Sequence, residues 1–262
     1  MFETVLYKIE DGVALITLNR PDRLNAANDQ LVSELSQAIA MAREDKNVRA
    51  LVLTGSGRAF CAGADVGGMQ REQKPTPFDI RNQLRDGAQK MILNIQKCEK
   101  PVIAAINGVA AGGGFDLACA CDMRFASDKA RFLEAFVRIG LFPGWGGTWM
   151  LPRIVGLAKA AELIWTGDEI DAKEAERIGL VSKVVPHEAL EKEVMALAKR
   201  LAQGPSIAIT LSKIAMYKGL ETDLETALEF ICAAETLTLT SGDHAEGVKA
   251  FREKRKANFQ GR

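Results

Sequence analysis

Residues 102–121 read VIAAINGVAAGGGFDLACAC: an apolar run, then three consecutive glycines within a second apolar stretch. The run at 102–106 predicts a buried strand, and the segment from Phe115 onward predicts the start of a helix. A strand, a glycine turn and a helix start together leave backbone N–H groups without partners at the positive end of the helix dipole. Such groups can stabilise negative charge that develops on an oxygen atom. Asp116 is the only acid beside them.

A second turn of this type comes earlier, at residues 59–65, with the sequence AFCAGAD. Two such turns predict two backbone donors for one oxyanion. Glycine suits this role because, without a side chain, it lets a ligand approach the main chain closely. The alternative for the run Gly112–Gly114 is a tight turn that binds no ligand.

The 262 residues include 34 basic and 34 acidic side chains, so the formal net charge is zero. This length suits one large α/β domain, or one domain with a small appendage. A balanced charge gives no reason to expect a nucleic acid or an acidic membrane surface as a partner. The first residues lack the pattern of a secretion signal, and the longest uncharged run, 101–115, is too short to span a bilayer. We therefore expect a cytoplasmic protein that binds neither nucleic acid nor membrane.

The five cysteines are odd in number and mostly have apolar neighbours, which predicts reduced, buried thiols. One residue separates Cys119 from Cys121, but no histidine lies nearby and the spacing matches no common zinc pattern. We therefore expect no metal site.

Strand and helix patterns alternate in the first part of the chain. Two apolar runs, 5–10 and 13–18, flank Asp11-Gly12, which is a strong hairpin signal. The predicted elements that follow are a helix with Leu31, Leu35, Ala38, Ile39 and Ala42 on one face, a strand at 48–54, a loop at 67–78, a helix with Leu84, Ala88, Met91, Ile92 and Ile95 on one face, and the strand at 102–106. This alternation predicts α/β architecture rich in parallel strands.

After Gly156 the chain is mostly helical, with one short apolar run at 180–185. Two predicted helices, separated by Gly204-Pro205, carry apolar faces made of Leu190, Val194, Leu197 and Leu201, and of Leu224, Leu228, Ile231 and Cys232. We expect a core domain over residues 1–200 and a helical region over 201–262. Such a region covers a site or joins subunits. The alternative is that it only completes the core.

Several short motifs occur in a fixed order along most of the chain. They are residues 18–21, 24–26, 60–65, 101–122, 140–148, 151–153 with Gly156, 166–167, 172–175, 179–181 and 251–255. Together they resemble the crotonase family, also called the enoyl-CoA hydratase/isomerase superfamily. The resemblance implies a spiral of ββα units with a C-terminal helical extension that forms a lid or a trimer contact, and a homotrimer or dimer of trimers. It also implies an acyl-CoA substrate and no cofactor beyond the coenzyme A of that substrate.

The resemblance assigns the two oxyanion donors to the backbone N–H groups of Ala64 and Gly113. In the family these donors polarise the thioester carbonyl and stabilise the enolate formed from it. Hydratases of the family also use two glutamates, and here the corresponding positions hold Asp116 and Phe136. Glu134 lies two residues before Phe136 and would share its face on a strand, which makes it a second candidate catalytic acid. The alternative for Glu134 is a structural or solvent-facing side chain.

Asp116 is the predicted general base, with a pKa raised by apolar neighbours. The alternative is that it only caps its helix. One carboxylate can move a proton between two carbons, which isomerises a double bond, whereas hydration needs one group to activate water and another to deliver a proton. Residues 132–136 and 147–153 are similar to the epoxyphenylacetyl-CoA isomerase branch, although Gly144 replaces the aspartate of that branch.

We therefore expect isomerisation or hydration of an unsaturated or cyclic acyl-CoA. One alternative is a catalytically impaired subunit that binds acyl-CoA. Another is an acyl-CoA hydrolase or decarboxylase on the same scaffold.

The remaining candidates would bind the substrate. Phe136, Phe142 and Trp145 cluster near the glycine motif and predict an apolar acyl pocket, or plain core packing. In the family, basic and aromatic tail residues contact coenzyme A, often from a neighbouring subunit; a solvated helix end is the alternative. The predicted binding residues are Asn25, Ala26, Ala62, Asp65, Val66, Phe136, Phe142, Trp145, Phe251 and Lys254.

Overall fold

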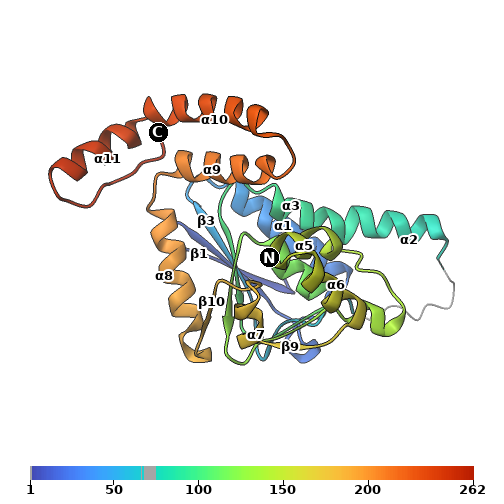
Figure 1. The fold of residues 1–262 in the computed structure, drawn as a ribbon. Coiled ribbons are helices and arrows are strands. Elements are labelled where there is room, and N and C mark those ends of the chain that lie inside the picture. Colours follow the sequence, from blue (N-terminus) through green and yellow to red (C-terminus); the bar gives the residue numbers. More distant parts are fainter. Residues whose placement is uncertain (1, 66, 68–74) are drawn as a thin grey trace.

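The computed structural model describes residues 2–65, 67 and 75–262 and has a mixed α/β fold (Figure 1). Among these residues, six strands form the larger sheet. In spatial order they are β1 (Val5–Glu10), β2 (Val13–Leu18), β3 (Ala50–Gly55), β5 (Val102–Ile106), β7 (Met123–Ser127) and β10 (Lys183–Val185). The pair β1 and β2 is antiparallel, and the other neighbouring pairs are parallel. β5 is buried along its whole length because both faces of the sheet are covered.

The smaller sheet has four strands in the described part of the chain. They are β4 (Ala59–Cys61), β6 (Val109–Ala111), β8 (Arg131–Leu133) and β9 (Ile170–Asp171). Strands β4, β6 and β8 run parallel, and β9 pairs antiparallel with β8. The chain repeatedly passes from a strand of the larger sheet to one of the smaller sheet and then into a helix, as in β5, β6 and α4. This repetition builds the predicted spiral of ββα units.

Helices cover both faces of the larger sheet, with α8 on one side and α1, α3 and α5 on the other (Figure 1). Their bounds are α1 (Asp29–Glu44), α2 (Pro77–Leu84), α3 (Lys90–Gln96), α4 (Gly113–Ala120), α5 (Gly147–Val155), α6 (Leu157–Thr166), α7 (Ala172–Arg177) and α8 (Leu190–Ala202). The single helix predicted around 84–95 is α2 and α3 joined by a π-helical turn, Arg85–Gln89. Every residue of α4 is buried, so this helix lies at the centre of the core.

Three further helices follow the core: α9 (Ser206–Gly219), α10 (Leu224–Leu239) and α11 (Gly242–Arg252). Figure 1 shows α9 and α10 alongside each other at one end of the molecule, with α11 extending away. No residue of α9 or α10 is buried. Their apolar faces therefore do not complete the core of this chain. The expected boundary after residue 200 stays a prediction.

The structure confirms the N-terminal hairpin residue for residue, and the central strand at 102–106. The predicted loop at 67–78 is partly wrong, because α2 begins at Pro77 behind a capping box on Thr76. Residues 68–74 of that loop lie outside the described part.

The buried face of α8 also differs from the prediction. Ala198 and Ala202 are buried, whereas Leu197 and Leu201 are only half-buried. Small side chains let a helix approach a sheet closely, and apolar periodicity does not distinguish that arrangement from a leucine face. In the described part of the chain, no helix has the length and apolar character needed to cross a bilayer.

Candidate active site

The two glycine turns lie against each other at the carboxyl ends of β4 and β6. The first turn passes through Gly63 to Ala64, and the second follows Ala111 and leads into α4 at Gly113. A Cβ on Gly63 would lie 2.7 Å from the carbonyl oxygen of Ala111 and 3.3 Å from the nitrogen of Gly113. Only glycine fits there, because a side chain would push the turns apart.

Both turns carry a backbone donor that has no acceptor among the residues that the structure describes. Ala64 forms an isolated parallel bridge with Ala27, in which Ala27 pairs with the carbonyl of Gly63 and the N–H of Asp65. The N–H of Ala64 therefore points the other way. Gly113 is the first residue of α4, where an N–H has no partner within the helix. Within the described residues, no acceptor pairs with either group.

Asn25 and Asp65 hold the first turn in place. The buried Asn25 amide donates to the carbonyls of Ser56 at 3.0 Å and Ala59 at 2.8 Å, and its oxygen accepts from the N–H of Arg20 at 2.9 Å. Asp65 forms an ion pair with Arg20 at 2.9 Å, and the hydrogen bond within this pair lowers the pKa of the carboxyl. The polar groups of both predicted binding residues are therefore engaged within the protein.

The other candidates near this turn are small. Ala26 is half-buried and its carbonyl accepts from the Arg20 guanidinium. Ala62 is half-buried too, and its N–H donates to the carbonyl of Leu24 at 3.0 Å. Val66 lies outside the described residues.

Asp116 and Glu134 form a buried pair of carboxyl groups. Asp116 lies in the first turn of α4, Glu134 directly follows β8, and neither is exposed to solvent. A Cβ on Gly147 would lie 2.1 Å from Oδ1 of Asp116 and 2.6 Å from Oε1 of Glu134. Both oxygens therefore face the same small space at the start of α5.

The structure excludes a solvent-facing Glu134. On a strand, Glu134 and Phe136 would share one face, as expected from the sequence. In the structure, however, β8 ends at Leu133 and a 3₁₀ helix begins at Ala135. The chain therefore turns at Glu134 and carries its carboxyl into the protein, while Phe136 remains half-buried.

Burial raises the pKa of both carboxyl groups. For Asp116 the rise is partly offset by the adjacent Glu134 carboxyl and by the backbone N–H groups of Gly147 and Trp145, of which the Trp145 N–H donates to Oδ2 at 3.2 Å. In the described part of the chain, no backbone N–H donates to Glu134. The nearby charge of Asp116 raises the pKa of Glu134 further. The backbone N–H groups near Asp116 therefore favour a negative charge on Asp116 rather than on Glu134.

The three predicted aromatic residues do not form one wall. The ring of Phe136 lies 3.7 Å from the position that a Cβ on Gly112 would take. The indole of Trp145 packs against Gly113, within 2.7 Å of the corresponding position there. Trp145 and the largely exposed Phe142 line a cavity of about 790 Å³, to which Phe136 does not contribute. Trp145 thus contacts both the second turn and this cavity.

The predicted tail residues lie apart from the carboxyl pair within this chain. Phe251 is 86% exposed and borders a hollow between α9, α10 and α11. Lys254 is exposed and follows α11 with a positive φ of 53°. Any contact between these side chains and a ligand on the glycine turns would have to come from another copy of the chain.

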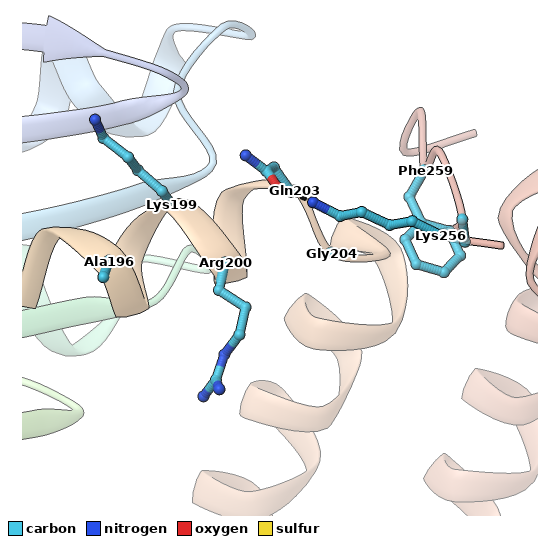
Figure 2. Close-up of a pocket in the computed structure, with 8 residues that line it drawn as sticks. Ala196, Lys199, Arg200, Gln203, Gly204, Lys256 and Phe259 are labelled. Atoms are coloured by element: carbon cyan, nitrogen blue, oxygen red, sulfur yellow. Dashed lines mark hydrogen bonds between the residues drawn. The ribbon is translucent and has the colours of Figure 1, made fainter. Parts of the chain in front are cut away.

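Figure 2 shows a second hollow, between the end of α8 and the C-terminal tail. Lys199 points toward the N-terminal hairpin, where it pairs with Glu10 and Asp11. Lys256 reaches the side chain of Gln203 at 2.6 Å, and Arg200 points away from both lysines. Because these cations diverge, the hollow does not form an anion site. In the described residues, no group of three or more His, Cys, Asp or Glu side chains could hold a metal.

Known proteins are similar to this chain in sequence and in fold. The profile of the enoyl-CoA hydratase/isomerase family matches residues 8–262. The chain belongs to that family. It is 41% identical to crotonyl-CoA hydratase of Syntrophomonas wolfei, with 98% of both chains covered, and 37% identical to 1,2-epoxyphenylacetyl-CoA isomerase of Escherichia coli, with 100% of both covered. The crystal structure of an enoyl-CoA hydratase from Bacillus anthracis matches with a TM-score of 0.93 and 35% identity, covering 99% of this chain and 100% of that one.

This chain is accordingly an enzyme of the enoyl-CoA hydratase/isomerase family. The relatives include both a hydratase and an isomerase at similar identity, so overall similarity does not separate the two reactions.

Sequence reasoning missed the role of Gly147. Its lack of a side chain makes the carboxyl pair possible, and its N–H faces Asp116. The Gly146-Gly147 pair before a helix was a visible signal. The sequence does not indicate why a glycine is needed at 147, because the two carboxyl groups that occupy the space come from α4 and from the residue after β8.

Proposed function

We propose that this enzyme binds an unsaturated or cyclic acyl-CoA and isomerises its double bond through an enolate. The thioester oxygen would accept hydrogen bonds from the N–H groups of Ala64 and Gly113. Asp116 would act as the base. The observation that supports this most is the juxtaposition of a buried acid with two backbone donors on adjoining turns, one of which begins the helix that carries the acid. Neither donor has an acceptor in the described part of the chain.

In this proposal, hydrogen bonds from the two donors provide most of the stabilisation of the enolate and of the transition state that leads to it. A proton next to a thioester is weakly acidic, and removing it places negative charge on the carbonyl oxygen. Fixed donors stabilise that charge, and losing one such donor costs about 3 kcal/mol in comparable sites. The positive end of the α4 dipole adds to this effect.

Asp116 would complete the reaction alone. Its carboxylate takes a proton from one carbon of the acyl group, the C–H electron pair passes into the enolate, and the proton then returns to a different carbon. No water molecule is consumed. The enzyme would need no cofactor beyond the coenzyme A of the substrate.

The phenyl ring of Phe136 favours isomerisation over hydration, because it packs against Gly112 of the second turn and can neither give nor take a proton. Hydration is the second candidate reaction, since Glu134 places a second carboxyl beside Asp116. A binding-only subunit, a hydrolase and a decarboxylase remain further alternatives.

The experiment is mass spectrometry of products formed from linear and cyclic enoyl-CoAs in heavy water. An isomer that carries deuterium on carbon without added water supports the proposal. A product that has gained water favours hydration, and free coenzyme A or loss of carbon dioxide favours a hydrolase or a decarboxylase. Bound but unchanged substrate, with binding unaffected by Asp116→Asn, favours a binding subunit.

We also propose that the enzyme assembles as a homotrimer or a dimer of trimers. Apolar side chains of α10, among them Leu224, Leu228 and Ile231, are exposed in this chain, although α10 packs against α9. In such an assembly, Phe251 and Lys254 of one copy would contact the coenzyme A bound to another.

A further inference from the structure

The carboxyl group of Glu134 is buried beside that of Asp116. Both of its oxygens are buried without a hydrogen-bond donor in the described part of the chain, and so is Oδ1 of Asp116. Buried polar atoms almost always have partners, because an unpaired one costs free energy. Oδ1 of Asp116 and Oε1 of Glu134 face the same small space beside Gly147, so a proton held between the two carboxyls would give both oxygens a partner.

The surroundings do not allow two negative charges. Among the described residues, the two carboxyls act on each other, and burial together with both carboxyls raises the pKa of the neighbouring Cys119 thiol. No lysine, arginine or histidine of the described residues acts on either carboxyl. Two like charges in apolar surroundings cannot both ionise, so the pair holds one proton at neutral pH.

The backbone decides which carboxyl holds that proton. Asp116 accepts the N–H of Trp145 and faces the N–H of Gly147 at the start of α5, where the helix dipole favours negative charge. Glu134 has neither donor. The negative charge therefore belongs on Asp116.

We infer that Glu134 is the positioning residue of the reaction: its protonated carboxyl donates a hydrogen bond to the Asp116 carboxylate and fixes that group for proton transfer. The inference rests on the proposed function, in which Asp116 is the base. In the reaction the C–H bond of the substrate breaks, its electron pair enters the enolate, and the proton forms an O–H bond on Asp116. The proton of Glu134 stays in place throughout, so the pair returns to its starting charge when Asp116 gives its proton back.

This role predicts different outcomes for two substitutions of Glu134. Glu134→Gln keeps a donor of similar shape, so its side-chain N–H can replace the carboxyl O–H. Glu134→Leu keeps the volume and removes the donor. A purely space-filling role would make the two variants alike.

The kinetic test is the pH profile of kcat/KM for the acyl-CoA that the wild type converts. Glu134→Gln should stay within about tenfold of wild type, with the acid limb of its profile unmoved. Glu134→Leu should lose at least about 100-fold, and its acid limb should move to higher pH because the Asp116 carboxylate has lost a donor. Equal profiles for Gln and Leu would overturn the inference.

A second measurement does not depend on turnover. The infrared spectrum of the wild-type protein at neutral pH should contain the band of a protonated, buried carboxylic acid, and Glu134→Gln should lack it. Absence of the band in the wild type would overturn the inference even if every acyl-CoA assay failed. If the band is present and no acyl-CoA reacts, the proposed function fails while the protonated pair stands.

Discussion

At the scale of single residues, the site depends on the absence of a side chain at Gly147. Gly147 begins α5 where the carboxyls of Asp116 and Glu134 meet. Any Cβ there would overlap both oxygens, so the identity of one glycine decides whether the pair can form.

We predict that Gly147→Ala lowers kcat/KM by about 100-fold or more, because it displaces Asp116 from the reacting carbon. The measurement is steady-state kinetics together with thermal unfolding, which should show a loss of about 1–3 kcal/mol from overpacking. Gly87→Ala is the matched control, since its Cβ would lie 3.9 Å from Val32 and meet ordinary contact. Full activity in Gly147→Ala would mean that the pair is not the reacting site.

The pKa of each carboxyl also predicts how stability depends on pH. Burial raises both values, with that of Asp116 at about 6, so the folded state binds more protons than the unfolded state above about pH 4. Stability from this pair is therefore greatest at low pH and falls as the pH rises through the window between the unfolded and folded values.

Glu134→Gln removes the larger of these two effects. We predict a flatter dependence of unfolding free energy on pH between 5 and 9 in this variant than in the wild type, measured by denaturant titration. The wild type should lose at most about 1.4 kcal/mol per pH unit through one such group. Parallel curves for the two proteins would contradict a protonated Glu134.

At the scale of elements, α4 links the site to the C-terminal helices. Asp122 lies just after α4 and accepts hydrogen bonds from Lys213 at 2.7 Å and Tyr217 at 2.8 Å, both on α9. It also accepts the N–H of Val102 at 2.7 Å, at the start of β5. One carboxylate thus ties the core sheet, the end of α4 and the helical region together.

We predict that Asp122→Ala lowers the free energy of unfolding by about 3 kcal/mol, because it leaves a largely buried ammonium group without its partner. Chemical denaturation measures this loss. Arg177→Ala serves as the control, since its ion pair with Glu174 lies on the surface and contributes little. An equal loss of unfolding free energy in both variants would show that Asp122 does not link these elements.

The elements also show what sequence patterns can predict. The hairpin follows from Asp11-Gly12 between alternating runs, and the buried strand β5 from its continuous apolar residues, because both signals are local. The position of Glu134 was not predictable in this way. It depends on β8, which pairs with β6 and β9, ending at Leu133, one residue before Glu134. It also depends on the space that remains because Gly147 has no side chain. Those are contacts between segments distant in sequence.

At the scale of the whole molecule, many apolar side chains of the C-terminal helices are exposed. The largely exposed apolar side chains of this region are Met216, Leu220, Leu224, Leu228, Ile231, Leu237, Leu239 and Phe251. Exposed apolar side chains gathered on neighbouring helices are typical of an interaction site.

We predict that the wild type is an oligomer and that Leu224→Glu with Leu228→Glu lowers its mass in solution, measured by light scattering after size-exclusion chromatography. The charges would be buried without partners in an interface made by α10. Lys192→Glu, on the exposed side of α8, should leave the mass unchanged. A monomeric wild type would contradict the proposed assembly.

In the proposed reaction, Asp116 transfers a proton at a thioester held by Ala64 and Gly113. The most direct measurement is the rate at which an enoyl-CoA substrate gains deuterium on carbon in heavy water, for the wild type and Asp116→Asn. We predict rapid exchange in the wild type and a loss of at least about 1,000-fold in the variant, with acyl-CoA binding retained. Exchange at the wild-type rate in Asp116→Asn would contradict the account.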